Sequence, residues 1–186
     1  RLLGLSLGAW TGAKLTARHP ELIEKLLVLS AWGRPRANVT PESSAAMRAL
    51  RDRRLRAVDE PSIEAIDEVF ADLIANPADR MLDLLALRLR IYQQPGMGAV
   101  MRHVFEGLGP EAWDKNMLTD AELRSISRPT MVVACVDHQD AFLKMAYEYK
   151  ALIPGVRFHE LRKASHWPQW ETAGELNRIS IDFFRE

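Results

Sequence analysis

A serine between two glycines lies close to the start of the 186-residue chain, in the stretch GLSLG (4–8). Gly4, Ser6 and Gly8 fit the pattern G-x-S-x-G, which here follows a short apolar run and precedes a stretch typical of a helix. Where a strand turns sharply into a helix, glycines leave room for a strained backbone that lifts one hydroxyl toward solvent. The pattern therefore predicts either an exposed serine nucleophile or a tight turn that contains a serine by chance.

Two further groups with suitable chemistry come late in the chain. A serine becomes a nucleophile near neutral pH when a histidine takes its proton and a carboxylate orients that histidine. Asp137 and Asp140 follow the apolar run TMVVACV (130–136), and His166 follows VRFHEL (156–161) after a short loop. The chain thus carries serine, acid and histidine in that order, each just after a candidate strand.

A parallel sheet is the element that could bring these groups together. The run KLLVLSA (25–31), like the two runs named above, is short, apolar and flanked by charge or turn residues, which favours a buried parallel strand. Between GLSLG and this run, a helical stretch ends near His19-Pro20. The start of the chain is therefore predicted to form a βαβ unit. Loops at the carboxyl ends of parallel strands meet at one edge, where we expect Ser6, the acid and His166 to converge.

The character of the sequence changes between about residues 36 and 118. Strand signals disappear there, and apolar residues recur at helical spacing in SIEAIDEVFADLIANP (62–77) and in ADRMLDLLALRLRIYQQ (78–94). Asn76-Pro77 is expected to end the first of these helices and to open the second. We therefore predict an α/β core in two parts, 1–35 and 119–186, with a helical cap at 36–118 inserted between them.

Composition argues against several classes of function. Lys plus Arg and Asp plus Glu both total 25, so the chain has no net positive charge that would favour binding to nucleic acid or to an anionic membrane. No apolar run approaches the roughly 20 residues of a membrane helix. The single Cys135 excludes an internal disulfide framework and fits a reducing cytoplasm. His138 and His166 lack a third ligand at suitable spacing, so we expect no metal site, and the chemistry requires no cofactor.

The stretches HWPQWE (166–171) and LRLRIYQQPG (87–96), together with the serine turn, carry a resemblance to a known family. The chain resembles the carboxyl-terminal two thirds of an α/β-hydrolase fold enzyme with a helical cap. It is most similar to the meta-cleavage product hydrolases, which cut carbon–carbon bonds in ring-opened aromatic 2-hydroxy-6-oxo-dienoates. The resemblance implies an α/β fold, a small-molecule substrate and pairing into homo-oligomers through edge elements.

The resemblance also implies a role for each residue of the core. Ser6 would be the nucleophile, His166 the general base, and Leu7 a backbone N–H donor to the oxyanion. The acid is Asp137 or Asp140. The family places a glycine three residues before its aspartate, and this chain has alanine at that place before Asp137, but the spacing to His166 favours Asp137.

The resemblance further implies that Trp167 lines the pocket and that a cap arginine pairs with the substrate carboxylate. Arg88 and Arg90 lie two positions apart, so one helix could present only one of them to the cleft. Counting back from Pro95 favours Arg88 over Arg90.

The fold implied by this resemblance has several strands before the nucleophile, and a loop that supplies a second oxyanion N–H. Neither precedes Arg1, so we expect the chain to be a fragment of a longer protein. The leading prediction is a serine-nucleophile hydrolase of dienoate carbon–carbon bonds. A carboxylesterase or lactone hydrolase with the same triad, and a non-catalytic hydrolase-like fragment, are the alternatives.

Overall fold

The computed structural model describes residues 1–35, 41–107, 115–137 and 141–186, without the side chains of residues 41–44, 46, 47 and 105–107. The described chain forms two compact units. The first consists of Arg1–Pro35 and Met117–Glu186, and the second of Arg36–Asn116.

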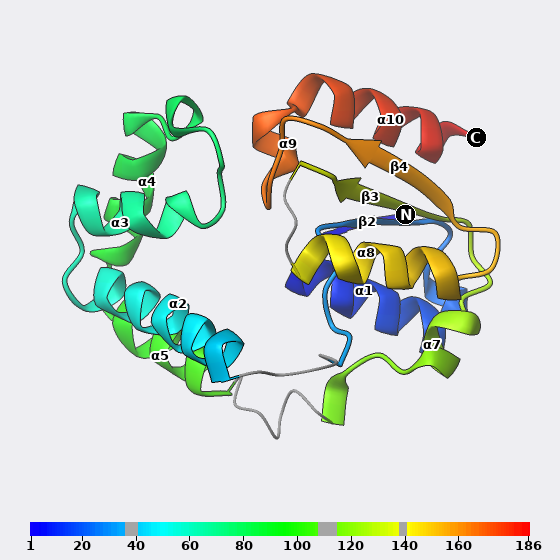
Figure 1. The fold of residues 1–186 in the computed structure, drawn as a ribbon, viewed down its shortest axis with the longest axis horizontal. Coiled ribbons are helices and arrows are strands. Elements are labelled where there is room, and N and C mark those ends of the chain that lie inside the picture. The colour runs from blue at the N-terminus through cyan, green and yellow to red at the C-terminus, as the bar shows by residue number, and fades with distance from the viewer. Residues whose placement is uncertain (36–40, 108–114, 138–140) are drawn as a thin grey trace. The chain divides into compact units, whose positions relative to one another are not determined.

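The first unit is built on a parallel sheet whose described strands are ordered β1-β2-β3-β4 (Figure 1). Leu5 pairs with Leu29 and Val133 with His159, and every pairing between neighbouring strands is parallel, so all carboxyl ends lie at one edge. The predicted α/β fold with a parallel sheet is confirmed. The strands are β1 (Leu2–Leu5), β2 (Leu26–Leu29), β3 (Thr130–Cys135) and β4 (Arg157–Leu161).

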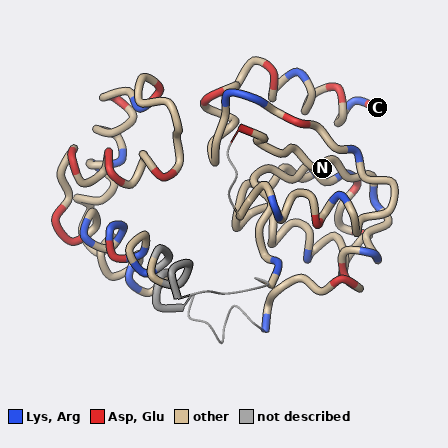
Figure 2. The backbone as a smooth tube through the Cα atoms, viewed as in Figure 1, with Lys and Arg blue, Asp and Glu red and all other residues tan. Residues whose placement is uncertain are grey.

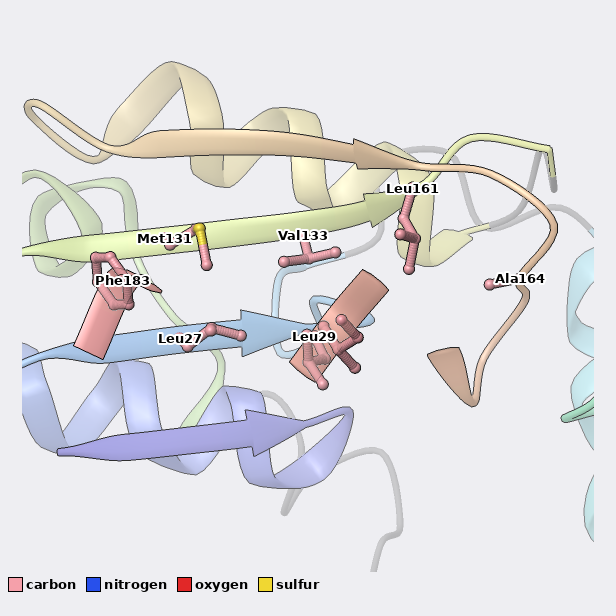
Figure 3. Close-up of a cluster of buried hydrophobic side chains, with 8 residues drawn as sticks. Leu27, Leu29, Met131, Val133, Leu161, Ala164 and Phe183 are labelled. Carbon is pink, nitrogen blue, oxygen red and sulfur yellow. The ribbon is translucent and has the colours of Figure 1, made fainter. Parts of the chain in front are cut away.

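Helices cover both faces of this sheet (Figure 1). On one face, the first helix packs closely at Gly12, where a Cβ atom would lie 3.2 Å from the Leu26 side chain of β2. On the other face, Leu27 and Leu29 pack with Val133 and with Phe183 of the last helix (Figure 3). This double coverage explains why the strands are continuous apolar runs. The helices of this unit are α1 (Leu7–Arg18), η1 (Pro20–Leu22), α7 (Asp120–Arg124), α8 (Ala141–Leu152), α9 (Pro168–Glu171) and α10 (Ala173–Arg185).

A buried arginine anchors the segment that follows β2. The Arg34 guanidinium donates to Asp120 Oδ1 (2.5 Å) at the start of α7 and to Glu148 Oε2 (3.0 Å) in α8. The same contact lowers the pKa of the Asp120 carboxyl below its usual range. The hydroxyl of the fully buried Tyr149 donates to the Trp32 carbonyl (2.7 Å). These bonds fix the backbone just after the carboxyl end of β2.

The second unit contains only helices among its described residues (Figure 1). The Ser62 Oγ accepts the Ala65 N–H (3.1 Å) and so caps the start of α3. The prediction that Asn76-Pro77 ends one helix and opens the next is wrong in its boundaries, because α3 already ends at Ala71 and α4 begins only at Leu82. Asn76 instead caps a short 3₁₀ turn. The elements are α2 (Pro41–Asp59), α3 (Ile63–Ala71), η2 (Pro77–Asp79), α4 (Leu82–Tyr92) and α5 (Met97–Gly107).

The charged residues of both units are interspersed rather than segregated by sign (Figure 2). No helix among the described residues is both long enough and apolar enough to span a membrane.

Candidate active site

Ser6 occupies a sharp turn between β1 and α1. Its φ of 54° and ψ of −112° lie in a region that non-glycine residues rarely adopt, at a cost on the order of 1–3 kcal/mol. Its N–H donates to the Leu29 carbonyl (3.0 Å), and its carbonyl accepts the Trp10 N–H (3.0 Å) in the first turn of α1. The strained conformation is therefore held by backbone hydrogen bonds on both sides of the residue.

The two glycines around Ser6 are not equivalent. A Cβ atom on Gly4 would lie 2.4 Å from the Gly8 carbonyl oxygen and 2.6 Å from the Gly8 carbonyl carbon. A Cβ atom on Gly8 would meet nothing within 4 Å. Neither glycine has a positive φ, so the backbone strain falls on Ser6 itself. Gly4 is thus required for the close approach of α1 to β1, whereas Gly8 is not required for space.

This difference makes a testable prediction about stability. We expect Gly4→Ala to lower the free energy of unfolding by about 1–3 kcal/mol, because the new methyl group meets backbone that cannot rotate away. Gly8→Ala is the matched control and should leave stability unchanged or raise it by up to about 1 kcal/mol, because alanine favours the helix. Urea denaturation followed by circular dichroism measures both. Equal destabilisation by the two changes would contradict the assignment of Gly4.

His166 lies in the loop between β4 and α9 and is 8% exposed. Its ring packs against Phe142 of α8 with centroids 4.1 Å apart, and Phe142 in turn contacts Trp32 at 5.0 Å. The Ser30 hydroxyl donates to the His166 carbonyl (2.9 Å). The imidazole and its backbone are therefore held by different elements of the first unit.

Ser6 and His166 lie at the same edge of the sheet. The Ser6 N–H donates to Leu29, and the next residue, Ser30, donates to the His166 carbonyl. Two hydrogen bonds and one peptide step thus connect the backbones of the predicted nucleophile and the predicted base. The backbones of Ser6 and His166 are therefore close neighbours at this edge of the sheet.

Asp137 reaches the loop that carries His166. Its Oδ2 accepts the Lys163 N–H (2.7 Å) and its Oδ1 accepts from the Arg162 guanidinium (3.2 Å). These two bonds run to residues before His166 rather than to its imidazole. Asp140 and His138 lie outside the described residues.

The remaining predicted residues of the core lie near the ends of two helices. Leu7 is the first residue of α1 and is 49% exposed, and a helix itself supplies no acceptor for the N–H groups of its first turn. The Leu7 N–H therefore has no acceptor within its own helix. Trp167 is half-buried and directly precedes α9, where its carbonyl accepts the Trp170 N–H (2.9 Å).

Arg88 belongs to the second unit and packs against aromatic rings. Its guanidinium carbon lies 5.7 Å from the Phe70 ring centroid and 5.6 Å from that of Tyr92. Arg88 is half-buried on α4, whereas Arg90 is exposed. The two arginines therefore have different environments, as their spacing along a helix predicts.

Ser30, Phe142 and Glu171 are parts of the site that the sequence patterns did not indicate. Glu171 accepts the Ser165 N–H (2.7 Å), which closes the loop just before His166. Only the place of Ser30 directly after an apolar run could have drawn attention to it. Among the residues that the structure describes, no three His, Cys, Asp or Glu side chains gather as metal ligands.

Known proteins match this chain over nearly its whole length, at low sequence identity. The chain is 25% identical to a 2-hydroxy-6-oxo-6-phenylhexa-2,4-dienoate hydrolase of Comamonas testosteroni, a match that covers 100% of the chain and 62% of that protein. It is 24% identical to a 2-hydroxy-6-oxononadienedioate/2-hydroxy-6-oxononatrienedioate hydrolase of Cupriavidus pinatubonensis, covering 98% and 61%. The chain thus spans about three fifths of the length of these curated relatives.

Solved structures share the same fold. A 2-hydroxy-6-oxo-6-phenylhexa-2,4-dienoate hydrolase from a Rhodococcus species matches with a TM-score of 0.81 at 17% identity, covering 99% of this chain and 63% of that one. A serine hydrolase from Cycloclasticus zankles matches with a TM-score of 0.79 at 22% identity, covering 98% and 62%. The family model for the alpha/beta hydrolase fold matches residues 2–173. The chain therefore belongs to the α/β hydrolase fold family.

Proposed function

We propose that the chain carries the catalytic triad of a serine hydrolase, with Ser6 as nucleophile, His166 as general base and Asp137 as acid. The observation that carries this proposal is the strained Ser6 at the same sheet edge as the buried His166. In the proposed reaction, His166 accepts the hydroxyl proton as Ser6 attacks a carbonyl carbon. The Leu7 N–H then donates to the resulting oxyanion.

We further propose that the whole protein acts on 2-hydroxy-6-oxo-dienoates. The names of the curated relatives in Comamonas and Cupriavidus support this substrate class. The dienoate would first tautomerise, and Ser6 or a water activated by His166 would then attack the ketone. The neighbouring carbon–carbon bond breaks, its electrons pass to the unsaturated acid fragment, and water completes the hydrolysis. Trp167 would line the pocket beside the base.

Two measurements test this function. A fluorophosphonate probe should label Ser6, as located by peptide mass spectrometry, and the protein should bleach the visible absorbance of a 2-hydroxy-6-oxo-dienoate. Cleavage of p-nitrophenyl esters without loss of the dienoate would replace the substrate proposal with a carboxylesterase or lactone hydrolase. A folded protein that neither reacts with the probe nor consumes either substrate would contradict the triad and favour a non-catalytic hydrolase-like module.

Arg88 is proposed to bind the substrate carboxylate. Its planar guanidinium suits bidentate binding of a carboxylate, and the Phe70 and Tyr92 rings restrain it. Arg88→Met keeps an apolar stem against the rings, and we expect it to raise KM for the dienoate by roughly 10- to 100-fold, the loss of one charge-assisted hydrogen bond. Arg90→Met is the control on the same helix. Equal values of KM in the two variants would contradict the assignment.

A further inference from the structure

Ser30 is placed beside Ser6 by the register of the sheet. Leu5 pairs with Leu29, so the residues that follow them, Ser6 and Ser30, leave neighbouring strands at the same edge. Ser30 is 7% exposed and lines a small hollow together with His166. Its hydroxyl is none of the three groups that the proposed triad requires.

The backbone of Ser30 adopts a conformation that serine does not favour. Its φ is 47°, in the left-handed region, where a residue with a Cβ atom is disfavoured by roughly 1–2 kcal/mol relative to the right-handed region. Glycine would adopt this φ without that cost. A buried serine at such a position points to a use for its hydroxyl, and that hydroxyl donates to the His166 carbonyl at 2.9 Å.

This hydrogen bond ties the base to the strand edge that holds the nucleophile. The loop from Leu161 to Pro168 is irregular, with Lys163 at a φ of 58°, and its buried carbonyl at His166 requires a donor. The imidazole extends from the same residue that receives the bond. A backbone shift there moves the ring relative to Ser6, and displacements of about 1 Å in a reacting group can cost on the order of 100-fold in rate.

We propose that Ser30 is a positioning residue that holds the His166 imidazole in place relative to Ser6. Ser30 acts through the His166 carbonyl and need not touch the substrate. The expected effect of Ser30 on the labelling rate rests on the proposed function. The position of the His166 ring, in contrast, can be measured without any turnover.

The test compares two replacements of Ser30 that separate its hydroxyl from its backbone strain. Ser30→Ala removes the hydroxyl and keeps the strained φ, whereas Ser30→Gly removes the hydroxyl and relieves the strain. Both variants should slow fluorophosphonate labelling of Ser6 by roughly 10- to 100-fold. Ser30→Gly should also melt at a higher temperature than Ser30→Ala, because glycine adopts the positive φ freely.

The position of the ring is read by NMR of the histidine side chains. The centroid of the Phe142 ring lies 4.1 Å from that of the imidazole, so its ring current should displace the His166 ring-proton signals, and we expect these signals to move in both Ser30 variants. The chain has five histidines, so His166→Gln assigns the signal. Ser180→Ala is the matched control: it removes another buried serine hydroxyl, 8% exposed in α10, and should change neither the labelling rate nor the His166 signals.

A folded Ser30→Gly protein that labels at the wild-type rate with unshifted His166 signals would overturn the proposal. Ser30→Gly keeps the test decisive even when Ser30→Ala does not fold. If the wild-type protein neither reacts with the probe nor consumes either substrate, the proposed function fails, and the His166 signals still decide whether Ser30 positions the ring.

Discussion

Ser6→Ala is expected to abolish labelling by the fluorophosphonate probe and to lower turnover on the order of 10⁴- to 10⁶-fold. The turn places Ser6 at the sheet edge where His166 lies, and alanine at this position has no hydroxyl that could attack a carbonyl. The labelling rate and the turnover number measure the effect. Ser125→Ala removes an exposed hydroxyl in the same unit and is the control, because it should label like the wild type.

Ser6→Gly separates the chemistry of this position from its strain. Alanine keeps a Cβ atom at a φ of 54°, whereas glycine reaches this conformation more easily. We expect both variants to be unreactive, with Ser6→Gly more stable than Ser6→Ala by about 1 kcal/mol in urea denaturation. Equal stability of the two variants would show that the turn does not store strain at Ser6. Labelling that persists in Ser6→Ala would assign the nucleophile to another residue.

The sheet of the first unit could be predicted because its strands are buried on both faces. Runs such as KLLVLSA (25–31) and TMVVACV (130–136) are continuous apolar segments, and they contain β2 and β3. The end of α1 was also predictable, since Pro20 excludes helical geometry at the residue before it. Parallel pairing then places Ser6 and His166 at one edge, which the hydrogen bonds of Leu29 and Ser30 connect.

Helix boundaries in the second unit could not be predicted as reliably as the strands of the first unit. Asn76-Pro77 has the features of a helix start, but Asn76 accepts the Ala78 N–H (3.1 Å) in a single 3₁₀ turn. The capping signal is the same for one turn and for a long helix, because it concerns only the first N–H groups. The length of the helix beyond its cap depends on packing that local sequence does not encode.

The supports of His166 were not predictable for a different reason. Ser30 and His166 are 136 residues apart, and their contact depends on the path of a loop rather than on any periodic pattern. Phe142 reaches the imidazole from a separate helix. The partners of Asp137 are likewise set by how the loop after β4 folds back on the end of β3. Sequence patterns identify groups at strand ends, but loop geometry decides which groups touch.

Asp137→Asn is expected to have the second large effect, a drop in turnover on the order of 10⁴-fold. Asparagine keeps the volume of the side chain, and its oxygen can still accept the Lys163 N–H, so the loop should remain in place. The negative charge that would steady a protonated His166 is lost. A thermal melt close to that of the wild type, together with the loss of turnover, would separate this electrostatic role from a structural one.

Asp140→Asn and Arg162→Met are the controls that locate the acid. We expect Asp140→Asn to retain turnover within a few-fold of the wild type, and the opposite pattern, with Asp137→Asn nearly unaffected, would move the acid to Asp140. Arg162→Met tests the ion pair on Asp137 Oδ1, in which the arginine side chain is 75% exposed. An exposed pair contributes little, at most about 1 kcal/mol, so this variant should stay active. A large loss in Arg162→Met would instead mean that the guanidinium, and not only the Lys163 N–H, holds the carboxylate toward the histidine loop.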